Sequence, residues 1–230
     1  VAMLTTSLVV GRAQTNNLPG LLKPGPNDPR IAYVTARLLE EYHYIQQPLD
    51  TAMSEKFYDE YFETLDYRHE NFLQSDLAEF NYYRTNLDHL TITTNGVADL
   101  TPEIKIFQRY LERYQEHVDY VNELLKKNKF KFTADDQYLL DRRNAPYPAD
   151  LAAAHKLWRD RLRYEYLQEK LSREISPTNS AVVLPLTKSN LLDITDTLIR
   201  HYRWSLHMAT NWDSTDVLQA YLEGLAHAYG

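Results

Sequence analysis

The stretch 40–43 (EEYH) holds the residue types and spacing that come nearest to a reactive site in this sequence. Glu40 and His43 are three residues apart, so on a helix both side chains lie on one face, as in di-iron carboxylate bundles. Such a bundle needs two Glu-x-x-His pairs and two further glutamates, and the nearest second pair here is the imperfect Asp66 and His69. We therefore interpret Glu40 and His43 as a solvated polar face and predict no metal ion and no cofactor. A ferritin-like metal oxidase stays open as a separate hypothesis for these residues.

Motifs of hydrolases and of nucleotide-binding sites do not occur in the 230 residues. The sequence lacks HExxH, GxSxG, Ser-x-x-Lys and a glycine-rich phosphate loop. Ser54 and Lys56 are two residues apart at a predicted helix start and would point in different directions, so we interpret Ser54 as a helix cap. Cysteine is absent, which excludes a thiolate nucleophile and a cysteine metal site. We predict that this chain carries no catalytic residue.

Histidine and tyrosine are the remaining residue types that could bind a ligand or a partner. The 18 tyrosines suit the rims of helix contacts, because each combines an apolar ring with a polar tip. We expect the pairs Tyr42/Tyr44 and Tyr164/Tyr166 to expose one ring each, which suggests a partner surface as a hypothesis. The 8 histidines are scattered, and we interpret them as surface or half-buried side chains: His43, His69, His89, His117, His155, His201, His207 and His227.

Composition and charge limit the class of protein. Hydrophobic residues make up 43% and charged residues 25%, which is typical of a globular protein with a core. The formal net charge of -7 argues against a nucleic-acid partner, because binding DNA or RNA needs a basic face. Beyond the first ten residues, no stretch approaches the roughly 20 apolar residues of a membrane span.

Residues 1–13 are interpreted as part of a secretory signal peptide. A short apolar run is followed by Gly11 and Ala13, which fit a small-x-small site with cleavage between Ala13 and Gln14. A buried strand or a tag remnant are the alternatives. Residues 14–27 are rich in Pro, Gly and Asn and are predicted to be a linker. We therefore expect an exported protein of the bacterial periplasm or cell envelope.

Apolar residues recur at spacings of three and four along most of the remaining chain. This pattern predicts an all-α, multi-helix bundle of about seven to nine helices, with long helices and short loops. The clearest pattern follows Thr101-Pro102 and predicts a helix roughly 39 Å long. The predicted core stripes are Ile31, Val34, Leu38, Tyr42 and Ile45; Phe57, Tyr61, Phe62 and Leu65; Leu77, Phe80, Tyr83 and Leu87; Ile104, Phe107, Leu111, Tyr114, Val118, Val121 and Leu125; Leu151, Ala154, Trp158, Leu162, Leu167 and Leu171; Leu191, Ile194, Leu198, Tyr202 and Leu206; Val217, Leu218, Tyr221, Leu222 and Leu225.

Caps and breaks set the predicted boundaries. Residues 28–175 are predicted to form an N-terminal helical domain, 176–189 a linker and 190–230 a helical pair. Predicted helix starts lie at Asp28-Pro29, Ser54, Ser75 with Asp76, Thr101-Pro102, Asp150 and Asp213, and Pro48 is predicted to end the first helix.

Several stretches together carry a family resemblance. They are Leu65-Asp66, 71–76 (NFLQSD), 130–170 with Phe-x-Phe-Thr, Leu-Asp-Arg, a proline-containing break and Trp158-Arg159, and 213–229 (DSTDVLQAYLEGLAHAY). In these stretches the chain resembles the N-terminal region of tail-specific proteases, the longer branch of the bacterial C-terminal processing peptidases, and the likeness covers about residues 28–229. The sequence departs from the family pattern at Gly230, where Asp is expected.

The resemblance implies a role within a longer serine protease. In that family the polypeptide continues into a PDZ domain, which captures apolar C-terminal tails of substrates, and a protease core with a Ser/Lys dyad. No position here matches the nucleophile or the base. The resemblance thus implies a non-catalytic domain that packs beside the PDZ and protease domains of the same polypeptide, shapes substrate access and offers a face to an adaptor protein. The alternative is a free-standing helical adaptor or scaffold of the cell envelope.

Overall fold

A computed structural model describes residues 22–127, 130, 132, 137–174 and 188–230. The predicted cleavage site at Ala13 and Gln14 and most of the predicted linker 176–189 lie outside this part. Within it the chain forms eight helices and no strand, which confirms the all-α prediction. The helices are α1 (Asp28–Tyr42), α2 (Thr51–Leu65), α3 (Gln74–Arg84), α4 (Leu87–Thr91), α5 (Thr101–Lys127), α6 (Leu151–Glu174), α7 (Lys188–Thr210) and α8 (Ser214–Tyr229).

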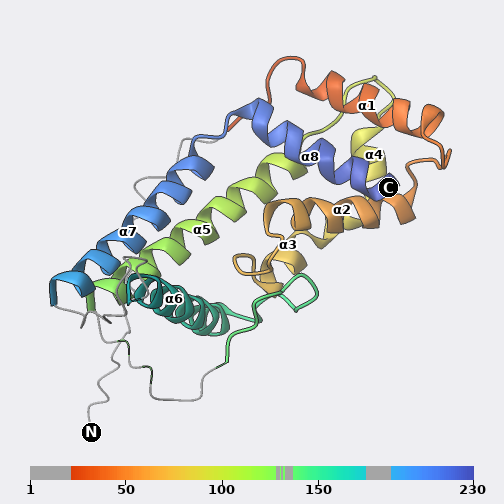
Figure 1. The fold of residues 1–230 in the computed structure, drawn as a ribbon. Coiled ribbons are helices and arrows are strands. Elements are labelled where there is room, and N and C mark those ends of the chain that lie inside the picture. Colours follow the sequence, from red (N-terminus) through yellow and green to blue (C-terminus); the bar gives the residue numbers. More distant parts are fainter. Residues whose placement is uncertain (1–21, 128–129, 131, 133–136, 175–187) are drawn as a thin grey trace, which may run out of the picture.

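Two hydrophobic cores share the long helix α5 (Figure 1). The first core is built mainly from α1, α2, α8 and the N-terminal half of α5. The second core is built from the C-terminal half of α5 with α6 and α7. Of the predicted pair 190–230, therefore, α7 lies in the second core and α8 in the first.

The apolar stripe of α5 explains why one helix serves both cores. Its spacing of three and four keeps the apolar side chains on one face along the whole helix. Phe107 and Leu111 pack in the first core, whereas Val118 and Leu125 pack in the second. The predicted stripe is confirmed, with Tyr114 half-buried between the two groups.

α2 and α8 pack closely against each other at Gly224. A Cβ atom at this position would lie 3.0 Å from the backbone N and Cα of Tyr61, which is tighter than ordinary packing allows. The ring of Tyr221 lies beside this crossing, with its centroid 4.6 Å from that of Phe57 and 5.0 Å from that of Tyr61. Gly224 therefore lets α8 pack close to α2, so that the ring of Tyr221 fits beside those of Phe57 and Tyr61.

Two of the predicted helix caps, Asp150 and Asp213, are confirmed, and three are wrong. Asn27 rather than Asp28 is the N-cap residue of α1, without a side-chain cap, and Leu73 rather than Ser75 is the N-cap residue of α3. Asp150 accepts a hydrogen bond from the N–H of Ala153 at 2.8 Å, and Asp213 accepts from the backbone of the first turn of α8. The prediction for Ser54 is wrong, because Asp50 caps α2 and the Ser54 hydroxyl is buried. That hydroxyl accepts a hydrogen bond from the N–H of Asp88 at 2.7 Å, so it joins α2 to α4, a short helix that the sequence did not predict.

The predicted stripe of α6 is confirmed only in its middle. Trp158 and Leu162 are fully buried in the second core, while Leu151 and Leu171 at the two ends are exposed. Tyr166 is buried in their place. The shift shows the drift of a 3.6-residue helix against a strict repeat of seven.

The predicted core stripe of α1 is wrong. Ala32 and Ala36 are the buried residues of this helix, apart from the first-turn Asp28. The large apolar side chains point outward instead, with Val34 42%, Leu38 52% and Tyr42 76% exposed. The helix also ends at Tyr42, well before Pro48. We call the outward residues the α1 stripe: Ile31, Val34, Leu38, Tyr42 and, just past the helix, Ile45.

Candidate functional site

Glu40 and His43 do not form a metal site. One Glu40 oxygen accepts a hydrogen bond from the N–H of Leu49 at 2.7 Å, and the other pairs with Arg37 at 2.6 Å. The His43 ring packs against the ring of Tyr229, with centroids 5.5 Å apart. The predicted solvated face is wrong for Glu40, whose side chain is only 12% exposed. Its carboxylate joins α1 to the start of α2.

Asp66 and His69, the imperfect second pair, also have structural partners. The Asp66 carboxylate accepts hydrogen bonds from the N–H groups of Glu70, Asn71 and Phe72, which forms a tight turn after α2. Burial raises the pKa of Asp66 to about 6, although these backbone hydrogen bonds oppose the shift. His69 bonds to the carboxylate of Glu63 and stacks on a tyrosine ring. Across the described residues, no group of three His, Asp or Glu side chains is placed to hold a metal ion.

Two histidines are more buried than the sequence analysis expected. His69 and His117 are buried, so the prediction of surface or half-buried histidines is wrong for them. The His117 ring stacks on Trp158 with centroids 4.6 Å apart, and its Nδ1 lies 3.0 Å from the side-chain oxygen of Asn71. Burial holds the pKa of His117 well below its ordinary value. This histidine is therefore a neutral core residue.

A buried ion-pair network surrounds Glu70. Its carboxylate pairs with Arg161 of α6, pairs with Arg68 at 3.1 Å and accepts a hydrogen bond from the hydroxyl of Tyr138 at 2.8 Å. The indole N–H of Trp158 donates to the backbone oxygen of Glu70 at 2.6 Å. Each charge in the network has an opposite partner, so we assign it to holding α6 against the turn after α2 rather than to catalysis.

Glu103 is a buried acid with neither an oppositely charged partner nor a hydrogen-bond donor among the described residues. It lies in the first turn of α5 and is fully buried, and neither carboxylate oxygen meets a hydrogen-bond donor among the described residues. Burial, together with the nearby charge of Asp28, raises the pKa of Glu103 to about 8. A raised pKa of this kind is common at active sites. Here no surface opening reaches the carboxyl, so it has no access to a substrate.

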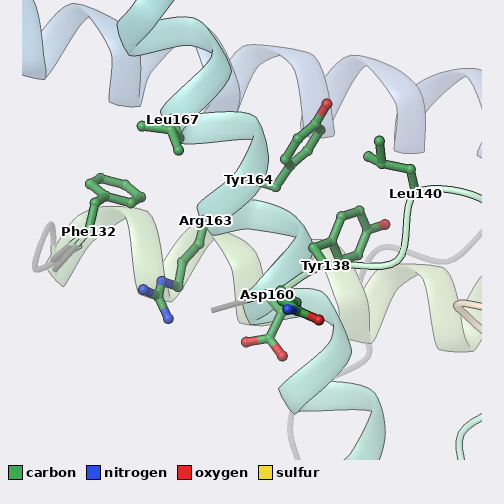
Figure 2. A pocket seen from close by; sticks show the side chains of 8 residues that line it. Phe132, Tyr138, Leu140, Asp160, Arg163, Tyr164 and Leu167 are labelled. Atoms are coloured by element: carbon green, nitrogen blue, oxygen red, sulfur yellow. The ribbon is translucent and has the colours of Figure 1, made fainter. Parts of the chain in front are cut away.

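A small surface cleft lies along α6 (Figure 2). Its volume is about 230 Å³, below the range of about 300–1,000 Å³ that is usual for small-molecule sites. Tyr164 of α6 lies beside Tyr138 of the preceding segment, and the two rings stack with centroids 5.5 Å apart, while Leu167 lies toward Phe132 at the other end of the cleft. Asp160 and Arg163 supply the charges, without a nucleophile beside them. The cleft can accept an apolar side chain but shows no catalytic arrangement.

Exposed apolar side chains remain as the best candidate for function. The α1 stripe is the larger group, and Trp204 with Met208 of α7 is a smaller one. Tyr42 and the adjoining Tyr44 both expose their rings, whereas Tyr164 is half-buried and Tyr166 is buried. None of the helices in the described part combines the length and apolar character needed to cross a bilayer.

Comparison with known proteins shows the family to which this chain belongs. Residues 35–230 match the family model described as "Tail specific protease N-terminal domain". Over 193 residues the chain is 30% identical to a curated tail-specific protease of Haemophilus influenzae, and this alignment covers 84% of the chain and 25% of the relative. The chain thus spans about a quarter of the length of this relative.

Proposed function

Because the chain belongs to the tail-specific protease N-terminal domain family, we propose that it is a non-catalytic helical domain of an exported bacterial serine protease. In this role it positions the catalytic parts of the same polypeptide, a PDZ domain and a protease core, and structures the access of substrates with apolar C-termini. The periplasm or cell envelope is the proposed location. An adaptor protein is a further proposed partner.

One observation carries the non-catalytic assignment. The acids and histidines that are buried in the described part serve structural contacts or are closed off from solvent. Glu70 is neutralised by arginines, His117 is stacked on Trp158, and Glu103 has no surface access. A hydrolase needs a nucleophile and a base within hydrogen-bond reach of each other and of the substrate.

The end of α8 supports the positioning role. Leu225 and Tyr229 are buried in the first core up to the last residue of the helix. A domain joined directly after residue 230 would begin from an anchored helix rather than from a flexible tether. Its position relative to the bundle would therefore be restricted, which is what a positioning domain requires.

The test uses a peptide substrate with an apolar C-terminus. We expect no cleavage by the 230-residue chain and cleavage by the full-length protein. Deletion of residues 28–230 from the full-length protein should lower kcat/KM roughly 10- to 100-fold, the range expected when reacting groups lose their positions. Thermal unfolding of the shortened protein must show that its remaining domains are folded. Cleavage by the 230-residue chain would refute the proposal.

Unchanged kcat/KM after the deletion would refute the positioning role. The alternative, a free-standing helical adaptor or scaffold of the cell envelope, instead requires that the reading frame encodes no PDZ domain and no protease core after residue 230.

A further inference from the structure

The α1 stripe is an apolar surface without a partner among the described residues. α1 packs against α8 through Ala32 and Ala36, so the small side chains face the core and the large ones face solvent. Single exposed apolar residues are normal, but a contiguous row of them marks an interaction site. The row here is unlike the buried stripes of α2 and α5.

The spacing of the stripe fits one mode of recognition. Ile31, Val34, Leu38 and Tyr42 are separated by three, four and four residues, so they form one ridge about 16 Å long. Amphipathic helices that bind a hydrophobic groove use anchors with this spacing. Arg37 and Glu41 form an ion pair beside the ridge and give it a polar rim, as at protein interfaces.

The position of the end of α8 favours a partner in the polypeptide that follows residue 230. α1 and α8 lie side by side and their C-terminal ends meet, as the ring contact between His43 and Tyr229 shows (Figure 1). Polypeptide that follows residue 230 therefore starts next to Tyr42 and Ile45, at one end of the α1 stripe. A domain tethered at this point is held near the stripe at a high effective concentration.

The size of the stripe also favours an intramolecular partner. A stable complex between separate proteins usually buries about 1,200–2,000 Å² in total. One helical ridge of four or five side chains is narrow for that purpose. A covalent connection removes much of the entropy cost of association, so a small interface suffices within one polypeptide.

We propose that the α1 stripe docks into an apolar groove of the domain that directly follows residue 230 in the full-length polypeptide. This inference rests on the proposed function, since it requires that such a domain exists. It adds the face of the bundle that makes the contact, and it explains why α1 turns its large apolar side chains away from its own core.

Thiol labelling tests the contact. The chain has no native cysteine, so Val34→Cys or Leu38→Cys introduces one thiol whose modification is followed on the peptide that contains it. Both side chains are exposed, so the substitutions leave the core intact. Ala152→Cys, at an exposed position on α6, is the matched control. In the 230-residue chain all three thiols should react at similar rates.

In the full-length protein, thiols at positions 34 and 38 should react at least about tenfold more slowly than in the 230-residue chain, because a docked residue reacts only when the interface opens. The thiol at position 152 should keep its rate. Equal rates at position 34 in the two proteins would overturn the proposal. Protection at position 34 that is already present in the 230-residue chain and rises with its concentration would assign the stripe to a second copy, and would overturn it as well.

The peptide cleavage assay separates this inference from the proposed function. If deletion of residues 28–230 lowers kcat/KM while the thiol at position 34 stays reactive, the positioning role stands and the assigned face is wrong. If the deletion has no effect while position 34 is protected, the docking contact stands and the positioning role is wrong.

Discussion

The unpaired acid Glu103 gives the most specific prediction about this bundle. Its carboxyl is fully buried near Asp28, and its oxygens lack donors among the described residues. Glu103→Gln replaces the acid by an amide of almost the same shape that does not titrate. The variant therefore isolates the cost of keeping an ionisable group at this position.

The size and sign of the effect follow from the pKa, which is 4.5 ordinarily and about 8 in the folded chain. Between these values the unfolded chain has lost the proton and the folded chain still holds it. Folding then takes up a proton, so the stabilising contribution is complete below pH 4.5 and is lost as the pH rises toward 8. The loss is about 1.4 kcal/mol per pH unit, which gives about 3 kcal/mol at pH 7.

Urea unfolding of the 230-residue chain at pH 5, 6, 7 and 8 measures this difference. We expect the free energy of unfolding of Glu103→Gln to exceed that of the wild type by an amount that grows by about 3 to 4 kcal/mol over this range. Glu123→Gln, at an exposed position of the same helix, is the control and should change the value by less than about 0.5 kcal/mol at each pH. Parallel curves for Glu103→Gln and wild type would show that the carboxyl is ionised in the folded chain, and the argument from burial would fail.

Three further predictions concern the buried contacts. Glu70→Ala removes one of the two carboxylates that pair with Arg161, leaving Glu165, and should lower the free energy of unfolding by about 1.5 to 3 kcal/mol in urea melts, against less than about 1 for Glu123→Ala. His117→Gln should reduce the acid sensitivity of the fold, because the pKa of His117 is lowered in the folded chain. The stability that the neutral histidine contributes is complete above pH 6.5 and is lost as the pH drops below that value. In urea melts at pH 6.5, 5.5 and 4.5, the free energy of unfolding should therefore fall less for the variant than for the wild type. Gly224→Ala should lower the melting temperature in calorimetry, because its Cβ meets the Tyr61 backbone and overpacking costs about 1 to 3 kcal/mol, more than the roughly 1 kcal/mol gained in helix propensity.

Local signals made most of the helices predictable. The apolar spacing along α5 and the caps at Asp150 and Asp213 involve residues within a few positions of each other, so one sequence contains all the required information. The failure at Ser54, by contrast, comes from a long-range contact. Asp50 and Ser54 are both good cap residues, and the contact that decides between them is made by Asp88, which is 34 positions away.

Long-range contacts made the buried charges unpredictable. Glu70 and Arg161 are 91 positions apart, and nothing in the sequence alone pairs them. Glu103 follows Thr101-Pro102 and has the pattern of an ordinary exposed acid in the first turn of a helix, yet the packing of the first core encloses it. The pair Glu40 and His43 was recognised as polar, but its partners lie in the loop before α2 and at the end of α8.

The orientation of α1 could not be predicted from the spacing of its apolar residues, and it gives a final prediction. A repeat of three and four says that apolar residues share a face, but does not say that this face meets the core. α8 brings the large side chains Leu225 and Tyr229 into the first core, and the small residues Ala32 and Ala36 allow α1 to pack closely beside it. Ala36→Leu should therefore overpack this contact and lower the free energy of unfolding of the 230-residue chain by about 1 to 3 kcal/mol.

Leu38→Ala is the matched change on the opposite face of α1 and should cost less than about 1 kcal/mol, because the side chain is exposed and leaves no cavity. The apolar pattern alone predicts the reverse order, with the leucine substitution the more damaging. Urea unfolding of the two variants decides between the readings. A larger loss of unfolding free energy for Leu38→Ala than for Ala36→Leu would mean that the α1 stripe is buried in the 230-residue chain. The stripe could then not be a free docking surface.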